Sequence, residues 1–123
     1  MANDNQLFHI DAIVVDGQAL AFEDGTGTLT GAARWENTAV PSAQGDDFNT
    51  RKRVPTTLHC KLQFANQINP ADLAKISAAQ ISARDTVNGR RALMPKCSFG
   101  SMGEIGNGTV DVVFNVLAAP QWL

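Results

Sequence analysis

The residues best suited to chemistry lie in one stretch, "NTAVPSAQGDDFNTRKRVP", residues 37–55. Its charged residues are two acids followed by three bases: Asp46, Asp47, Arg51, Lys52 and Arg53. Two carboxylates could act as a glycosidase pair or as calcium ligands. Adjacent residues of an extended chain point to opposite sides, however, and the further oxygen ligands that calcium needs do not cluster nearby. We expect neither site here.

The three bases could instead bind nucleic acid. They stand beside two acids and have no aromatic platform, and the whole chain carries a net charge of -2, whereas nucleic-acid binders normally have a basic excess. A solvated or inter-subunit charge pair is the favoured interpretation of the run.

The sequence offers few residues that could bind a metal ion or a cofactor. The two cysteines, Cys60 and Cys97, lack CxxC spacing, and His9 and His59 are the only histidines, too few ligands for a metal site. We expect free, packed thiols and no cofactor. No GxSxG, P-loop or strand-to-helix GxGxxG motif is present, and the glycine-rich residues 100–108 precede a strand, so we expect no enzyme.

Size and composition indicate one globular domain over residues 1–123. Hydrophobic residues make up 44% of the chain and charged residues 18%. No apolar run is long enough to span a membrane, and the first residues lack a signal-peptide pattern, so we expect synthesis in the cytoplasm.

Strand signals dominate the chain. Residues 8–15 and 18–23 flank an Asp-Gly turn, and residues 28–36 follow as a strand with Gly31 as a bulge. Residues 54–64 and 109–117 alternate apolar and polar side chains, which predicts two half-buried strands and places His59 on the polar face. In "NPADLAKISA", Asn69 and Pro70 are typical of a helix start, and Leu73 and Ile76 give that short helix an apolar stripe.

A hairpin is expected where Asn88 and Gly89 form a two-residue type I′ turn, which pairs Val87 with Arg90. Both faces of this hairpin mix polar and apolar residues. Such a sheet fits either an ordinary edge hairpin or one that meets a neighbouring subunit or a wet channel.

These elements predict a mainly β fold: a β-sandwich or partly closed β-barrel with one short flanking α-helix. Residues 37–53 are expected to be a long loop without secondary structure, ordered only by assembly; loops of this length are usually functional or disordered. We expect residues 1–7 to be a flexible N-terminal segment. Residues 118–123 are expected to form a tail whose Trp122 is free to dock on a partner.

The segments "VVDGQALAF", "GDDFNTRKRVPTTLHCKLQFA", "NPADLAKI" and "TVNGRRALMPKCSFGSMGEIGNGTVDVVFNV" occur in an order that resembles the tail tube proteins of contractile-tailed bacteriophages. The resemblance covers roughly residues 10–116 and depends on the order of elements, not on an invariant motif. It implies a structural virion protein whose hexameric rings stack into the hollow tail tube through which the tape measure protein and then DNA pass. The implied partners are further copies of the chain, the tail sheath, the tape measure protein, the baseplate hub and the tail terminator. It also implies a virion location after assembly in the host cytoplasm, with DNA passing unbound and no membrane contact.

Within this picture, residues 37–53 are the contact between subunits and rings. The predicted contact residues are Val40, Asp46, Asp47, Phe48, Arg51, Lys52 and Arg53. Phe48 and Val40 are the expected anchors, because exposed ion pairs contribute only about 0–1 kcal/mol each. Arg84, Arg90 and Arg91 are candidates for facing either the lumen or the sheath. Two alternatives stay open: the tube protein of a phage-derived contractile injection or secretion system, and a non-catalytic β-sandwich binding module.

Overall fold

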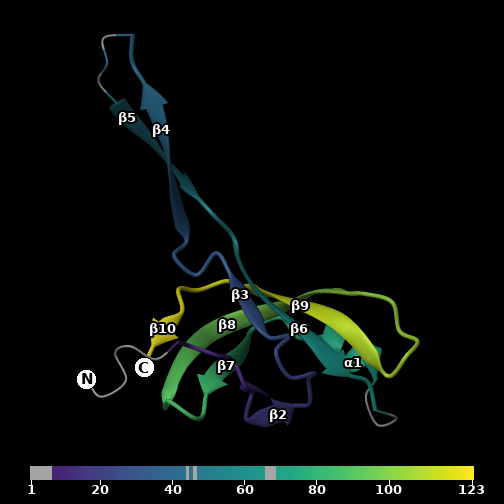
Figure 1. The fold of residues 1–123 in the computed structure, drawn as a ribbon. Coiled ribbons are helices and arrows are strands. Elements are labelled where there is room, and N and C mark those ends of the chain that lie inside the picture. The colour runs from purple at the N-terminus through teal and green to yellow at the C-terminus, as the bar shows by residue number, and fades with distance from the viewer. Residues whose placement is uncertain (1–6, 44, 46, 66–68) are drawn as a thin grey trace.

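The computed structural model describes residues 7–43, 45, 47–65 and 69–123, which form a mainly β fold with one short helix (Figure 1). The elements in chain order are β1 (Ala12–Val15), β2 (Gln18–Leu20), β3 (Thr28–Thr30), β4 (Trp35–Pro41), β5 (Asp47–Arg53), β6 (Thr56–Gln63), α1 (Pro70–Ala74), β7 (Ala79–Asp85), β8 (Arg90–Met102), β9 (Thr109–Val116) and β10 (Gln121–Trp122). The predicted fold class, mainly β with one short flanking helix, is confirmed.

The main sheet has eight antiparallel strands in the order β2-β1-β7-β8-β9-β6-β3, with β10 added alongside β8. The long strand β8 pairs with β7 along its first part and with β9 along its last part. It thereby joins the two halves of the sheet, and the buried residues of both halves form one hydrophobic core. The path ends at β2 and β3, so the sheet is curved but is not closed into a barrel.

The two strands with clear alternation lie side by side in the core. Leu58 and Cys60 of β6 are opposite Phe114 and Val112 of β9, and all four side chains are buried. His59 of β6 lies on the outer face, 3.6 Å from a carboxylate oxygen of Asp111. The predicted faces of both strands are confirmed.

The helix also follows its sequence signals. The Asn69 side chain accepts a hydrogen bond from the backbone N–H of Ala71 at 3.0 Å, and Pro70 occupies the first turn. Leu73 and Ile76 pack against the core, so α1 covers part of it. The tight turn between β1 and β2 is confirmed as well, because Asp16 and Gly17 both have positive φ.

The β7–β8 hairpin differs from its predicted register. Asp85, not Val87, is paired with Arg90, so four residues form the connection and not two. The cause is the Asp85 carboxylate, which accepts hydrogen bonds from the backbone N–H and the side-chain amide of Asn88. These bonds hold Asn88 inside a longer turn, so the expected two-residue turn is wrong.

The faces of this hairpin are also cleaner than the sequence indicates. One face is core, because Ile81, Ala83, Ala92 and Met94 are fully buried. The register shifts between the pairs Ala79–Cys97 and Ile81–Met94. An extra residue in one strand reverses the side of those beyond it, and this irregularity places Cys97 on the core side, as a packed thiol.

The last residues fold back on the domain. Trp122 in β10 pairs with Ala92 of β8, and its ring meets the ring of Phe8 edge-on at 5.4 Å between centroids. Trp122 therefore has partners in its own chain, contrary to the expectation of a free tail.

The largest correction concerns residues 37–53, expected to be a loop without secondary structure. They lie mostly in β4 and β5, which form a two-stranded antiparallel sheet of their own. Alternation is missing from the sequence because both faces of this ribbon are open to solvent, so no buried face imposes a period of two.

Candidate functional site

The β4–β5 hairpin is the most unusual surface of the molecule. Its strands pair residue by residue from Trp35–Arg53 at the base to Pro41–Asp47 near the tip. Figure 1 shows the ribbon extending well beyond the main sheet, and no other described strand pairs with it. Among the described residues, the hairpin thus leaves two faces and two edges without a neighbouring strand.

The base of the hairpin is set by unusual backbone geometry. Gly31 and Arg34 have positive φ values of 72° and 68°, and they interrupt the strand expected over residues 28–36. A Cβ atom at Gly31 would collide with the backbone carbonyl oxygen of Pro55. The backbone N–H of Val54 donates to the carbonyl of Arg34 at 2.8 Å, which closes the base where the chain returns to the main sheet.

One face of the ribbon carries the two expected anchors. Val40 and Phe48 lie directly opposite each other, and their side chains are 44% and 63% exposed. Residues that face each other across strands share one side of a sheet, so the two side chains form one small apolar patch near the tip. The structure brings together the two residues that were expected to anchor a contact.

The opposite face carries a cation–aromatic contact. The Arg51 guanidinium carbon lies 4.4 Å from the centroid of the Trp35 ring, which is 48% exposed. Arg53 is directly opposite Trp35 on the same face, whereas Lys52 is on the Val40 face opposite Glu36. The three bases therefore point to both sides of the ribbon, so they do not form a single patch.

Trp35 was not among the residues singled out from the sequence. The sequence gives no sign of its role, because Trp35 is far from the three bases along the chain and meets Arg51 only through the β4–β5 pairing. Asp46 lies outside the described residues. Asp47 closes the strand pairing opposite Pro41, and this places the acidic end of the segment near the tip.

The three other candidate arginines are divided between two places. Arg84 of β7 and Arg91 of β8 are directly opposite each other on the face away from the core. Arg90 lies at the end of β8, where its guanidinium carbon is 4.9 Å from the centroid of Trp122. Only Arg84 and Arg91 form a local site.

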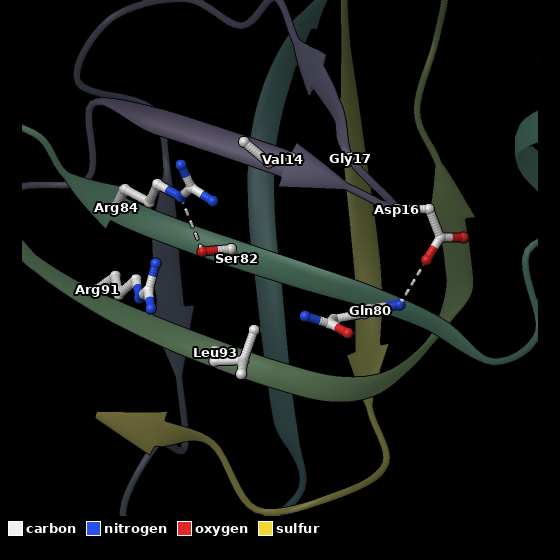
Figure 2. A pocket seen from close by; sticks show the side chains of 8 residues that line it. All are labelled: Val14, Asp16, Gly17, Gln80, Ser82, Arg84, Arg91 and Leu93. Carbon is white, nitrogen blue, oxygen red and sulfur yellow. Dashed lines mark hydrogen bonds between the residues drawn. The ribbon is translucent and has the colours of Figure 1, made fainter. Parts of the chain in front are cut away.

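These two arginines border a shallow depression of about 440 Å³ on the outer face of β1, β7 and β8 (Figure 2). The Nε–H of Arg84 donates to the Ser82 hydroxyl at 3.1 Å, and an Asp16 carboxylate oxygen accepts from the backbone N–H of Gln80 at 3.0 Å. The residues that line the depression are Val14, Asp16, Gly17, Gln80, Ser82, Arg84, Arg91 and Leu93.

The cysteines belong to the core. Cys60 and Cys97 are both free and fully buried, and burial raises the pKa of each thiol to about 11. Within the described ranges no cluster of His, Cys, Asp or Glu could hold a metal ion. Of the described helical residues, none belongs to a helix long and apolar enough to cross a membrane.

Comparison with known proteins finds structures of similar fold but no matching family. No family model matches the chain, and no curated protein matches it. Among solved structures, one similar chain comes from the sheath–tube complex of an extracellular contractile injection system, PVC, in the extended state. It has a TM-score of 0.61 and 7% identity, and the match covers 91% of this chain and 86% of that one.

A second similar chain comes from the sheath/tube terminator of the same kind of system, with a TM-score of 0.60 and 7% identity. The match covers 95% of this chain and 94% of that one. At this identity the likeness concerns the fold alone. The chain has a fold that occurs in the structural components of contractile injection systems, over nearly its whole length.

Proposed function

We propose that this protein is the structural subunit of the hollow inner tube of a contractile particle, built from stacked hexameric rings. The observation that carries the proposal is the β4–β5 hairpin, which leaves a domain of contractile-system fold and has no partner strand among the described residues. An isolated two-stranded hairpin is marginally stable in water, and a partner that covers its faces would stabilise it.

In the proposed assembly, the hairpin of one subunit lies against the next subunit or ring. The contact residues are Val40, Asp46, Asp47, Phe48, Arg51, Lys52 and Arg53, to which Trp35 is added. Phe48 and Val40 supply the apolar anchor, because a partly exposed aromatic side chain gains more from burial than an exposed ion pair. The charged residues set the register between copies.

The open main sheet supports ring formation. Its path ends at the short strands β2 and β3. The residues that follow β2 already bond to β6, through the Phe22–Leu62 bridge and the hydrogen bond from Gln63 to Ala21, so the remaining open edges are short. Joining the sheets of neighbouring subunits into one continuous wall around a lumen would satisfy such edges. Either the lumen or the sheath would then meet the outer face that holds Arg84 and Arg91, and the end of β8 that holds Arg90.

The particle is either a phage tail or a phage-derived injection or secretion system. In a phage the location is the virion, assembled in the host cytoplasm, and the tube is the conduit for DNA. The proposed partners are other copies of the chain, the sheath, the tape measure protein, the baseplate hub and the terminator, and the role is not enzymatic.

A β-sandwich binding module is the second candidate. It would need an aromatic platform for a ligand, and the chain offers Trp35 and Trp122 without any tyrosine. Trp35 is in contact with Arg51, and Trp122 is in contact with Phe8 and Arg90. The two rings lie on separate elements, β4 and β10, so the tube proposal is favoured.

Negative-stain electron microscopy of the purified protein over a range of concentrations separates the two candidates. Rings or tubes that lengthen with concentration support the tube subunit. A protein that stays monomeric at every concentration, and that binds a glycan saturably, would contradict it.

A further inference from the structure

Arg84 and Arg91 form a pair of like charges on neighbouring strands. They are directly opposite in the β7–β8 register, and Figure 2 shows both guanidinium groups rising from the same face of the sheet. Arg84 is half-buried and Arg91 is exposed. Like charges directly opposite each other destabilise a sheet, so this pairing needs an explanation outside the sheet itself.

No carboxylate neutralises the pair within the described part of the chain. The acids at this end of the sheet accept hydrogen bonds from groups other than these two arginines. Asp11 accepts from the backbone N–H and hydroxyl of Thr86, and Asp85 accepts from Asn88 and from the backbone N–H of His9. Asp16 accepts from the backbone N–H of Gln80. Neither Arg84 nor Arg91 therefore forms an ion pair with a carboxylate of these residues.

We propose that the Arg84–Arg91 pair binds the carboxylate of an acidic side chain on a partner protein. A guanidinium presents its N–H donors in a planar fork that matches a carboxylate, and two neighbouring forks can hold one carboxylate between them. The depression beside the pair supplies what the rest of a peptide needs: apolar contact from Val14 and Leu93, and an amide donor and acceptor from Gln80.

The surroundings favour a protein segment over a nucleic acid. The basic site is short, since it consists of two arginines and ends at the Asp16 carboxylate in the same depression. A phosphate backbone needs a longer basic track and would be repelled at that end. The net charge of -2 for the whole chain acts in the same direction. An acidic side chain within a mixed peptide meets neither obstacle.

The inference concerns a surface of one subunit and does not depend on ring or tube assembly. Its test is fluorescence anisotropy at low salt, with a labelled hexaglutamate peptide and a labelled oligothymidine of six nucleotides. The wild-type protein is expected to bind the peptide saturably and more tightly than the oligonucleotide. Tighter binding of the oligonucleotide would overturn the proposal in favour of a nucleic-acid surface.

Three variants locate the site. Arg91→Gln and Arg84→Gln are each expected to weaken peptide binding by about tenfold, a usual loss for one buried charged contact. Arg91→Lys keeps the charge but not the planar fork, and it is expected to weaken binding severalfold. Arg34→Gln, at the base of the hairpin, is the matched control and should leave the affinity unchanged. Equal affinities for the wild type and all four variants would overturn the proposal.

The melting temperature of the Arg91→Gln variant separates a binding role from a purely structural one, because the two roles predict changes of opposite sign. Because the two charges repel, Arg91→Gln is expected to keep or raise the melting temperature of the free protein. A clear fall in melting temperature, with peptide binding unchanged, would show that the pair serves the fold and not a partner.

Discussion

Val40 on β4 lies directly opposite Phe48 on β5, and the two side chains form an exposed apolar patch on a hairpin that extends beyond the main sheet. Soluble monomers usually keep large aromatic side chains in their cores, as this chain does with Phe114. Phe48 stands instead on a ribbon with no described partner strand. The pair therefore ranks first among the contacts that assembly would bury.

Replacing Phe48 by alanine is expected to weaken self-association without loosening the domain. We expect the critical concentration for assembly to rise by at least about tenfold, or about 1.4 kcal/mol per contact, because a central aromatic anchor carries much of an interface. Sedimentation velocity measures the change, and the melting temperature should stay within about 2 °C of wild type, because the side chain is already exposed.

Two controls accompany this variant. Asn49→Ala changes the neighbouring residue on the other face of the ribbon and should have little effect. Asp47→Asn should weaken assembly less than Phe48→Ala, since ion pairs at protein surfaces contribute only about 0–1 kcal/mol. A larger effect from Asp47→Asn would reverse the proposed order of anchor and register contacts.

Gly31 is expected to be indispensable for the hairpin base. Alanine there must adopt a positive φ and also brings a Cβ against the carbonyl oxygen of Pro55. We expect a loss of up to about 3 kcal/mol in the free energy of unfolding, measured by urea denaturation. Gly25→Ala is the matched control, because Gly25 also has positive φ but faces open space, so it should cost only about 1 kcal/mol. Equal losses at the two positions would show that the Pro55 contact is unimportant.

Asp85 is expected to make the fold sensitive to acid. Its hydrogen bonds, chiefly from the Asn88 side chain and then from backbone N–H groups including that of His9, hold the pKa of this carboxyl below its ordinary value. A lowered pKa in the folded state contributes stability above the unfolded pKa of about 3.9, and that stability is lost as the pH falls through the folded value.

Asp85→Asn should therefore lower the melting temperature at pH 7 and reduce its further fall below about pH 4. Thermal unfolding monitored by circular dichroism at pH 7 and pH 3 measures both effects. Glu104→Gln, an exposed acid in the β8–β9 connection, is the control and should change neither. An Asp85→Asn protein as stable as wild type at pH 7 would contradict the role given to the carboxylate.

The thiols of Cys60 and Cys97 are expected to resist alkylation in the folded protein. With a pKa of about 11, about 0.1% of each thiol is ionised at pH 8, against roughly a quarter of a free cysteine with a pKa of about 8.5. Iodoacetamide labelling followed by mass spectrometry should be at least about 100-fold slower than for the protein unfolded in urea. Rapid labelling of the native protein would indicate that the core opens readily.

The fold is visible in the sequence where a strand has one apolar, buried face and one polar, exposed face. The alternation in β6 and β9 gives the position of Phe114 and the outer place of His59, and the Asn-Pro start gives α1. Burial on one side is what produces a period of two, so these elements could be predicted without other information.

The elements that were missed depend on contacts that local patterns do not encode. The β4–β5 hairpin has no buried face, so its residues carry no alternation. The β7–β8 register depends on the Asp85 carboxylate bonding to Asn88, and the place of Cys97 depends on an irregularity in strand pairing. The Arg84–Arg91 pair emerges only from the register between two strands.

If the β4–β5 hairpin joins copies of this chain into a tube, removing it should stop tube assembly. The most direct test is electron microscopy of the wild-type protein beside a variant in which residues 37–51 are replaced by a short glycine-rich turn, with circular dichroism to show that the domain folds. We expect tubes from the wild type, and a folded variant that stops at single subunits or single rings. Long tubes from the folded variant would contradict it.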